Sequence, residues 1–253
     1  MTFDPIRFLD RGYDFVDLHI SSFPVNQIME GWQRFLARPL EEKLRWGIQP
    51  KGYWMPDPGF FVKDGTRDDE TWKLSDEKQY FHFNSRFRIG VNNRLVQPVS
   101  LAELAEWNDW LQAQELVYES VNRRFLELAR ALDGVLGGSV LTSRSNSASV
   151  LRTMQYDAGK PGKPHADKSA VTFHLYTSHP GYLMRGESIE SPPGKVLVFG
   201  GRKLAFVLDR PDLAVQHEAA PYINASGETR KVIVFFGHLR MPELKSPDQA
   251  NYE

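Results

Sequence analysis

The chain has no cysteine among its 253 residues. Disulfides, cysteine nucleophiles, thiolate metal sites and iron–sulfur clusters are therefore excluded, and any metal must be held by histidine and carboxylate side chains. The sequence also lacks a run of the roughly 18 apolar residues that a membrane span requires, and its first residues lack the apolar segment and cleavage site of a signal peptide. We therefore expect a cytoplasmic protein that has no membrane partner.

An excess of charge of either sign is missing as well. Lysine and arginine total 31, and aspartate and glutamate total 32, so the net charge is -1. A chain without excess positive charge does not attract nucleic acid electrostatically, so a small molecule is the expected partner. The charge balance leaves the oligomeric state open. The length fits one domain over residues 1–253, because single hydrophobic cores stop growing near ~250–300 residues.

The first part of this domain, residues 1–140, reads mostly as helix and loop. The clearest helix begins with a capping box at Ser100 and repeats apolar residues at helical spacing to a stop at Gly134, which predicts a helix over about 101–133. Residues 47–99 are rich in glycine, proline and aromatic residues without a period, which indicates loops with short strands.

From residue 147 to about 240 the period becomes that of short strands separated by turn-rich segments. The strand-like segments are SASVLRTMQY, SAVTFHLYTS, GKVLVFG, KLAFVLD and RKVIVFFGHL. Helices followed by a run of short strands predict a mainly β fold with supporting helices, whose core over 147–240 is a sandwich or barrel.

A candidate metal site begins at His165, the one histidine that is followed two places later by a carboxylate. On a strand, residues two apart point to the same face, so His165 and Asp167 can present an imidazole and a carboxylate side by side. A mononuclear Fe(II) oxygenase uses two histidines and one carboxylate, and His217 lies in the strand-rich half, where another strand can supply it. Arg230, at the head of RKVIVFF, adds a cation whose planar fork suits a carboxylate.

Four segments that carry these residues follow one another in a fixed order: LRTMQYDAG, HADKSAVTFHLYTSHPGY, AVQHEA and RKVIVFF. They resemble the isopenicillin N synthase-like branch of the Fe(II)/2-oxoglutarate oxygenases, which shows a Leu-Arg/Lys-x-Asn-Tyr-Tyr-Pro strand, His-x-Asp-x-Ser-x-Leu-Thr, a distal His, and Arg-x-Ser before Phe-Phe. Upstream, FLARPLEEKLRW with KGYW, and DEKQYFHF, are similar to the family more loosely. The likeness therefore runs from about residue 12 to 240 and implies a double-stranded β-helix, a cupin-like jelly roll.

The resemblance also implies the cofactors and their ligands. Fe(II) would be held by His165, Asp167 and His217, with 2-oxoglutarate and O2 as cosubstrates. Arg230 would pair with the distal carboxylate of 2-oxoglutarate, and Tyr156 would hydrogen-bond to the same group. The implied enzyme is a dioxygenase that most simply hydroxylates an unactivated C–H bond, forms succinate and CO2 as co-products, and needs no catalytic residue beyond the metal ligands.

Two positions depart from the family pattern. The family's Asn is Met154 here, and the Ser after its Arg is Val232, which is expected to lie against the methylenes of 2-oxoglutarate. These departures favour one alternative, an oxidase of the same fold that does not use 2-oxoglutarate and whose Arg230 binds a substrate carboxylate. A second alternative is a cupin-like protein that binds a metal or small ligand without oxidising it.

The substrate is the least constrained part of this interpretation. Arg152 lies on the strand of Tyr156 and is expected to face the barrel interior, where it meets a substrate anion or forms a structural salt bridge. Arg86 and Arg88 in FHFNSRFR, and Tyr53 in KGYWMPDPGFF, belong to the half that the family uses to cover its pocket. Together they favour an amphipathic substrate with an acidic group and an apolar or aromatic body. His174 is expected to be a packing or surface residue.

Overall fold

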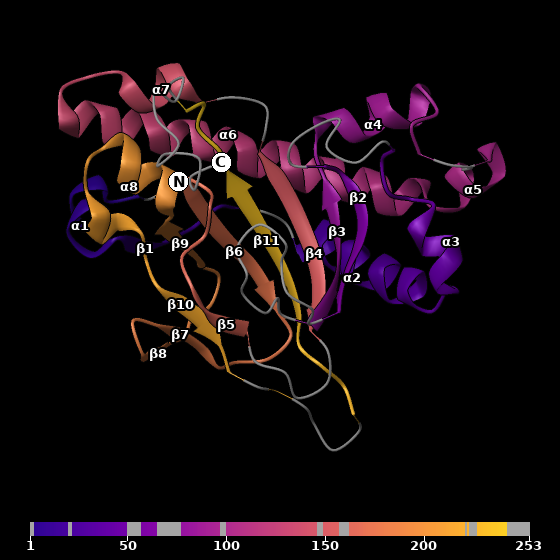
Figure 1. The fold of residues 1–253 in the computed structure, drawn as a ribbon. Coiled ribbons are helices and arrows are strands. Elements are labelled where there is room, and N and C mark those ends of the chain that lie inside the picture. The colour runs from indigo at the N-terminus through magenta and orange to yellow at the C-terminus, as the bar shows by residue number, and fades with distance from the viewer. Residues whose placement is uncertain are drawn as a thin grey trace.

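Two antiparallel sheets form the centre of the molecule (Figure 1). The computed structural model describes residues 3–19, 22–49, 57–64, 77–96, 100–145, 149–156, 162–220, 222 and 227–241. The helices are α1 (Pro5–Arg11), α2 (Ser22–Leu36), α3 (Leu40–Leu44), α4 (Ser85–Asn92), α5 (Leu101–Glu106), α6 (Asn108–Leu136), α7 (Val140–Arg144), α8 (Arg202–Val207) and the 3-10 helix η1 (Pro211–Leu213). None of these helices is long and apolar enough to cross a membrane, and this statement concerns the described ranges alone.

The strands are divided between a large and a small sheet. They are β1 (Tyr13–Val16), β2 (Gly59–Asp64), β3 (Glu77–Phe83), β4 (Val150–Tyr156), β5 (Gly162–His165), β6 (Val171–Thr177), β7 (Tyr182–Met184), β8 (Glu187–Ile189), β9 (Val196–Gly200), β10 (His217–Ala219) and β11 (Lys231–Gly237). The major sheet has the order β1-β9-β6-β11-β4-β3-β2, and the minor sheet has the order β5-β10-β7-β8. Non-consecutive neighbours in both sheets and a cavity lined from both make this the double-stranded β-helix expected from the sequence.

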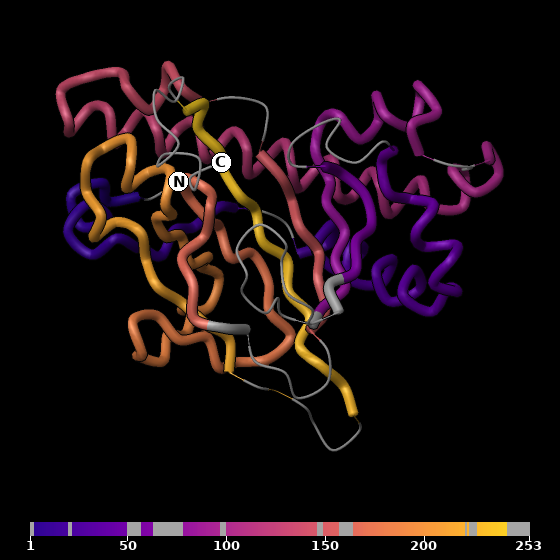
Figure 2. Tube along the Cα trace, in the orientation of Figure 1, coloured from indigo at the N-terminus to yellow at the C-terminus, as the bar shows by residue number. Residues whose placement is uncertain are grey.

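Segments far apart in the sequence complete the major sheet. Figure 2 shows the indigo N-terminal segment beside the orange chain, where β1 pairs with β9. At the other edge, β2 and β3 come from the region 47–99 and extend the sheet beyond β4. The major sheet therefore reaches well outside the strand-rich part of the sequence.

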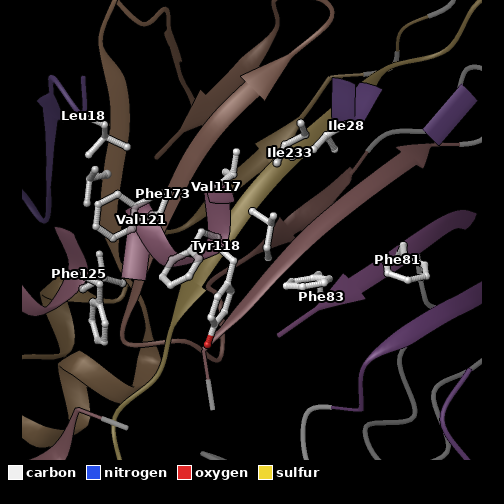
Figure 3. Packing of buried hydrophobic residues seen from close by; sticks show 14 of the residues in the cluster. Leu18, Ile28, Phe81, Phe83, Val117, Tyr118, Val121, Phe125, Phe173 and Ile233 are labelled. Atoms are coloured by element: carbon white, nitrogen blue, oxygen red, sulfur yellow. The ribbon is translucent and has the colours of Figure 1, made fainter. Parts of the chain in front are cut away.

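The long helix α6 covers one face of the major sheet with an apolar stripe. The ring of Tyr118 lies 6.0 Å from that of Phe83 and 5.7 Å from that of Phe235, measured between ring centroids, and Phe125 and Val121 are fully buried nearby (Figure 3). The sequence predicted a long helix over about 101–133 with this amphipathic pattern, and α6 is its main part. Ser100 forms the predicted capping box with Glu103 at the start of α5, just before α6.

Two details of the predicted elements were wrong. The predicted helix is interrupted at Trp107, whose buried ring packs against Phe35. It ends at Leu136, close to the predicted end near residue 133. The stop is Gly137, which adopts a left-handed conformation with φ 72° that suits glycine. The predicted strand KLAFVLD is helix α8 instead, because a short apolar run fits either structure until its tertiary neighbours decide.

Candidate metal centre

Strand pairing in the minor sheet brings the three predicted ligands together. β10 pairs with β5 so that His217 lies directly opposite His165, and their ring centroids are 4.4 Å apart. Oδ1 of Asp167 lies 3.4 Å from Nε2 of His165 and 3.7 Å from Nε2 of His217. One ligand atom from each residue lies within 4.8 Å of the others, so the three atoms surround one point.

Strand alternation is only part of the reason why His165 and Asp167 meet. His165 is the last residue of β5, and Asp167 lies beyond the strand end, where its carbonyl accepts a hydrogen bond from the backbone N–H of Arg202 (2.8 Å). The hydroxyl of Thr172 on β6 donates to Oδ2 of Asp167 (2.6 Å), and the Ser169 hydroxyl lies 2.9 Å from that of Thr172. These contacts leave Oδ1 directed at the two imidazoles.

The geometry fits a divalent first-row metal. Ligand atoms ~2.1 Å from such an ion and at right angles to one another are roughly 3 Å apart, close to the separations observed. Nδ1 of His217 lies 3.2 Å from the carbonyl oxygen of Val215, so an Nδ1–H donates there and leaves Nε2 with a free lone pair. Such an outer hydrogen bond is the usual support of a metal-binding histidine.

The charge states also suit a metal site. Burial alone would raise the pKa of Asp167, but the adjacent His217 and His165 and the hydrogen bond from Thr172 outweigh burial and hold the pKa of this carboxyl well below its usual range. Burial lowers the pKa of His217, against the opposing effect of Asp167. The site therefore presents an ionised carboxylate and a neutral, ligating imidazole at neutral pH.

A cavity extends from this triad between the two sheets. Its described lining consists of Lys78, Arg152, Met154, Tyr156, His165, Asp167, Thr172, His174, Tyr182, His217, Ala219, Arg230, Val232, Val234 and Phe236. The triad thus forms part of the wall of this cavity.

Arg230 is buried in the wall of this cavity and makes no ion pair with any carboxylate in the described part of the chain. Its Nη1 and Nη2 donate to the carbonyl oxygens of Gly181 (3.2 Å) and Pro180 (2.5 Å), and its buried Nε has no hydrogen-bond partner among the described residues. Gly181 has φ 99°, and a Cβ there would lie 2.9 Å from Nη2 of Arg230, so glycine keeps this space open. Tyr156 and Val232 line the cavity with Arg230, as the sequence predicted.

Arg152 faces the same cavity from β4. Its Nε donates to Nε2 of His82 (2.8 Å), and its guanidinium carbon lies 4.9 Å from the ring centroid of Tyr80 and 4.6 Å from that of Phe236. The prediction that Arg152 points into the barrel is therefore confirmed, and within the described ranges it forms no salt bridge.

Arg86 and Arg88, which were also predicted to be near the substrate, do not line the cavity. Arg88 lies on α4 and pairs with Glu115 of α6, with Nη2 and Oε2 2.9 Å apart. Arg86 lies on the same helix, whose Phe87 packs in the core on the helical side of the major sheet, and neither arginine lines the cavity. The structure therefore does not bring these two arginines to the cavity, because tertiary packing directs α4 toward α6. Tyr53 lies outside the described residues.

Sequence reasoning missed several cavity residues, of which three matter for the chemistry of the site. Lys78 is buried on β3 with its ammonium 5.4 Å from the ring centroid of Tyr156. His174, expected to be a packing or surface residue, is buried and lines the cavity. Burial and the neighbouring His217 and Arg230 lower the pKa of His174 to about 4. Thr172 was not considered as the residue that orients Asp167. The alternation of Lys78, Tyr80 and His82 in DEKQYFHF was the available signal for β3.

Comparison with known proteins gives matches to solved structures alone: no family model and no curated protein matches the chain. A full-length protein of Neurospora crassa in complex with alpha-KG, which is 2-oxoglutarate, aligns with a TM-score of 0.66 at 16% identity, over 98% of this chain and 84% of that one. JOX2 in complex with 2OG, Fe and JA gives a TM-score of 0.65 at 16% identity, over 96% and 75% of the two chains.

The fold is that of the 2-oxoglutarate/Fe(II) oxygenases. A dioxygenase for auxin oxidation in rice has it too, with a TM-score of 0.64 at 15% identity over 94% of this chain and 78% of that one. The oxygenase fold thus places His165, Asp167 and His217 in one wall of the cavity between its two sheets.

Proposed function

We propose that this protein is an Fe(II)- and 2-oxoglutarate-dependent dioxygenase that oxidises a C–H bond of a small molecule, most simply by hydroxylation. One observation carries the proposal. A two-histidine, one-carboxylate triad and a buried arginine without a counter-ion in the described chain line the same cavity of an oxygenase fold. The four segments that resemble the isopenicillin N synthase-like branch support placing the protein in that branch.

The residues have distinct roles in this reading. His165, Asp167 and His217 would hold Fe(II), which with 2-oxoglutarate and O2 supplies oxidative decarboxylation to succinate and CO2 coupled to C–H oxidation. Arg230 binds the distal carboxylate of 2-oxoglutarate, and burial strengthens this pairing by excluding competing water. Tyr156 hydrogen-bonds to the same carboxylate.

The walls of the cavity complete the cosubstrate site. Val232 and Met154 lie on neighbouring strands in direct register and pack in one apolar cluster, where they contact the methylenes of 2-oxoglutarate and exclude water. Asp167 would bind the metal through its carboxylate, and this favours oxygen transfer over halogenation, which needs that ligand position to be free for a halide.

A second function is favoured by one observation. Val232 and Met154 supply no hydroxyl or amide at the positions where the family has Ser and Asn, so the cosubstrate end of the cavity has fewer hydrogen-bond donors. In that reading the protein is an Fe(II) oxidase of the same fold, and Arg230 binds a carboxylate of the substrate itself.

The decisive experiment measures succinate. Protein reconstituted with Fe(II) is supplied with 2-oxoglutarate, O2 and a panel of amino acids, fatty acids and aromatic metabolites. The proposal predicts succinate release that requires O2 and Fe(II) and rises with a substrate. Protein that binds Fe(II) but never consumes 2-oxoglutarate would favour the oxidase, and protein that oxidises nothing would favour a cupin-like binding function.

A further inference from the structure

The second buried arginine of the cavity, Arg152, occupies a different place from Arg230. Tyr156 lies opposite Arg230 across the sheet, since the Tyr156 N–H donates to the Arg230 carbonyl (3.1 Å). Arg152 lies four residues before Tyr156 on β4. At ~3.3 Å per residue, the backbone position of Arg152 is roughly 13 Å along the strand from the position of Tyr156 and Arg230. The two arginines therefore enter the cavity wall from well-separated backbone positions.

The charges of the cavity do not balance. Among the lining residues that the structure describes, three are cationic (Lys78, Arg152 and Arg230) and Asp167 is the single carboxylate. The oxygens of Asp167 are already directed at Thr172 and at the two histidines. A buried guanidinium without an anion is costly, so a ligand that stays in this cavity beside Arg152 gains by bringing a negative charge.

The surroundings of Arg152 specify what kind of anion fits. Its Nε is engaged by His82, which leaves the two Nη groups as a planar fork, the geometry that pairs with a carboxylate through two parallel hydrogen bonds. The rings of Tyr80 and Phe236 lie against the guanidinium, and Val234 and Met154 continue an apolar wall. The site thus combines one carboxylate-binding fork with apolar surface.

We propose that the substrate is a monocarboxylate with an apolar body, whose carboxylate pairs with the Nη groups of Arg152 while 2-oxoglutarate occupies Arg230. This inference rests on the proposed function, because it assigns the second anion of the same active site. In this arrangement Arg230 binds the cosubstrate, and Arg152 binds the substrate.

His82 is a positioning residue for Arg152. Because its Nε2 accepts the hydrogen bond from Arg152, its proton is on Nδ1, which donates to the carbonyl oxygen of Asp57 (3.0 Å). This pair of hydrogen bonds fixes the ring and prevents the guanidinium from turning away from the cavity. A side chain without an acceptor at this position would release Arg152.

The test compares monocarboxylates with their neutral primary amides. Protein loaded with Fe(II) and 2-oxoglutarate without O2 is titrated calorimetrically with linear, cyclic and aromatic monocarboxylates, each paired with the amide of the same skeleton. The inference predicts at least one skeleton whose carboxylate binds more tightly than its amide. In Arg152→Met this preference falls roughly 10- to 100-fold, as expected when charge-assisted hydrogen bonds are lost.

Two controls separate this role from a structural one. Arg130→Met, at an exposed position on α6, should leave the preference unchanged. Arg152→Met should melt at the same temperature as the parent protein or higher, because it removes a buried charge, and should still bind 2-oxoglutarate. His82→Phe should weaken the carboxylate and not the amide, and His82→Gln, which restores an acceptor, should recover the loss.

Three results would overturn the inference: no carboxylate in the panel binds more tightly than its amide, Arg152→Met keeps the preference, or Arg152→Met unfolds while His82→Phe keeps the preference. If the parent protein binds Fe(II) but not 2-oxoglutarate, the proposed function itself has failed. The two failures are thereby distinguished.

Discussion

The two faces of the major sheet serve opposite purposes. On the face toward α6, side chains such as Phe173, Ile233 and Phe235 are completely buried and apolar. On the face toward the cavity, Arg152 of β4 and His174 of β6 both carry polar groups that apolar residues could have replaced. Buried charge costs stability, whereas apolar burial provides it. One face therefore stabilises the fold, and the other is built to hold ligands.

The largest effect is expected at the triad. Replacing Asp167 with Ala removes the carboxylate that both histidines face, so metal binding and turnover should be abolished while the helical face keeps the fold intact. Equilibrium dialysis with Fe(II) or Mn(II), together with circular dichroism, measures both. Asp212→Ala, in an exposed ion pair with Arg210, is the control. Undiminished metal binding in Asp167→Ala would place the metal elsewhere.

Two neighbouring residues of β11 compare the faces directly. Phe235→Ala leaves a cavity in the core and should lower the free energy of unfolding by about 3–5 kcal/mol, as measured by urea denaturation. Phe236→Ala should cost less, because that ring is 8% exposed and borders the cavity. Equal losses would mean that the cavity face is packed as tightly as the core.

Arg230→Lys tests the cosubstrate end of the cavity. The ammonium keeps the charge but loses the planar fork, so affinity for 2-oxoglutarate should fall by roughly 1.5–3 kcal/mol while metal binding survives. Calorimetric titration measures this, with the exposed Arg210→Lys as control. If the affinity for 2-oxoglutarate stays the same and that for substrate falls, Arg230 anchors the substrate and the oxidase reading is better.

A subtler change concerns the support of Asp167. Thr172→Val keeps the shape of the side chain but removes the hydrogen bond to Oδ2, and metal affinity should fall about 10- to 100-fold, the usual effect of losing an outer partner of a ligand. The matched control, Thr177→Val, changes an exposed hydroxyl on the same strand. Equal metal affinities in the two variants would show that Asp167 needs no such support.

The smallest expected effect is a gain. Val232→Ser places a hydroxyl in the cavity wall beside Arg230 and should tighten 2-oxoglutarate binding by about 0.5–1.5 kcal/mol. Val62→Ser, at an exposed position on β2, should leave that affinity unchanged. A loss of affinity in Val232→Ser would indicate that the apolar wall, rather than hydrogen bonding, holds the methylenes.

The features that could be predicted are those with a recognisable pattern in the sequence itself. The triad and Arg230 were predicted because the His-x-Asp spacing, the strand periodicity and the order of the motifs are visible in the amino-acid sequence. The roles of Lys78, His82 and Thr172 depend on β3 joining the sheet and on β6 facing Asp167, which are long-range pairings that no local pattern specifies. The position of Arg88 was not predictable for the same reason, because only packing reveals that it pairs with Glu115.

The central claim is that the cavity face of the sheet holds Fe(II) and 2-oxoglutarate together. An anaerobic titration of the Fe(II)-loaded protein with 2-oxoglutarate tests it most directly, since chelation of Fe(II) by the 2-oxo acid produces a visible charge-transfer absorption. The account predicts a saturable band that requires both components, is absent in Asp167→Ala and needs more 2-oxoglutarate in Arg230→Lys. A parent protein that retains Fe(II) but develops no band at saturating 2-oxoglutarate would contradict it.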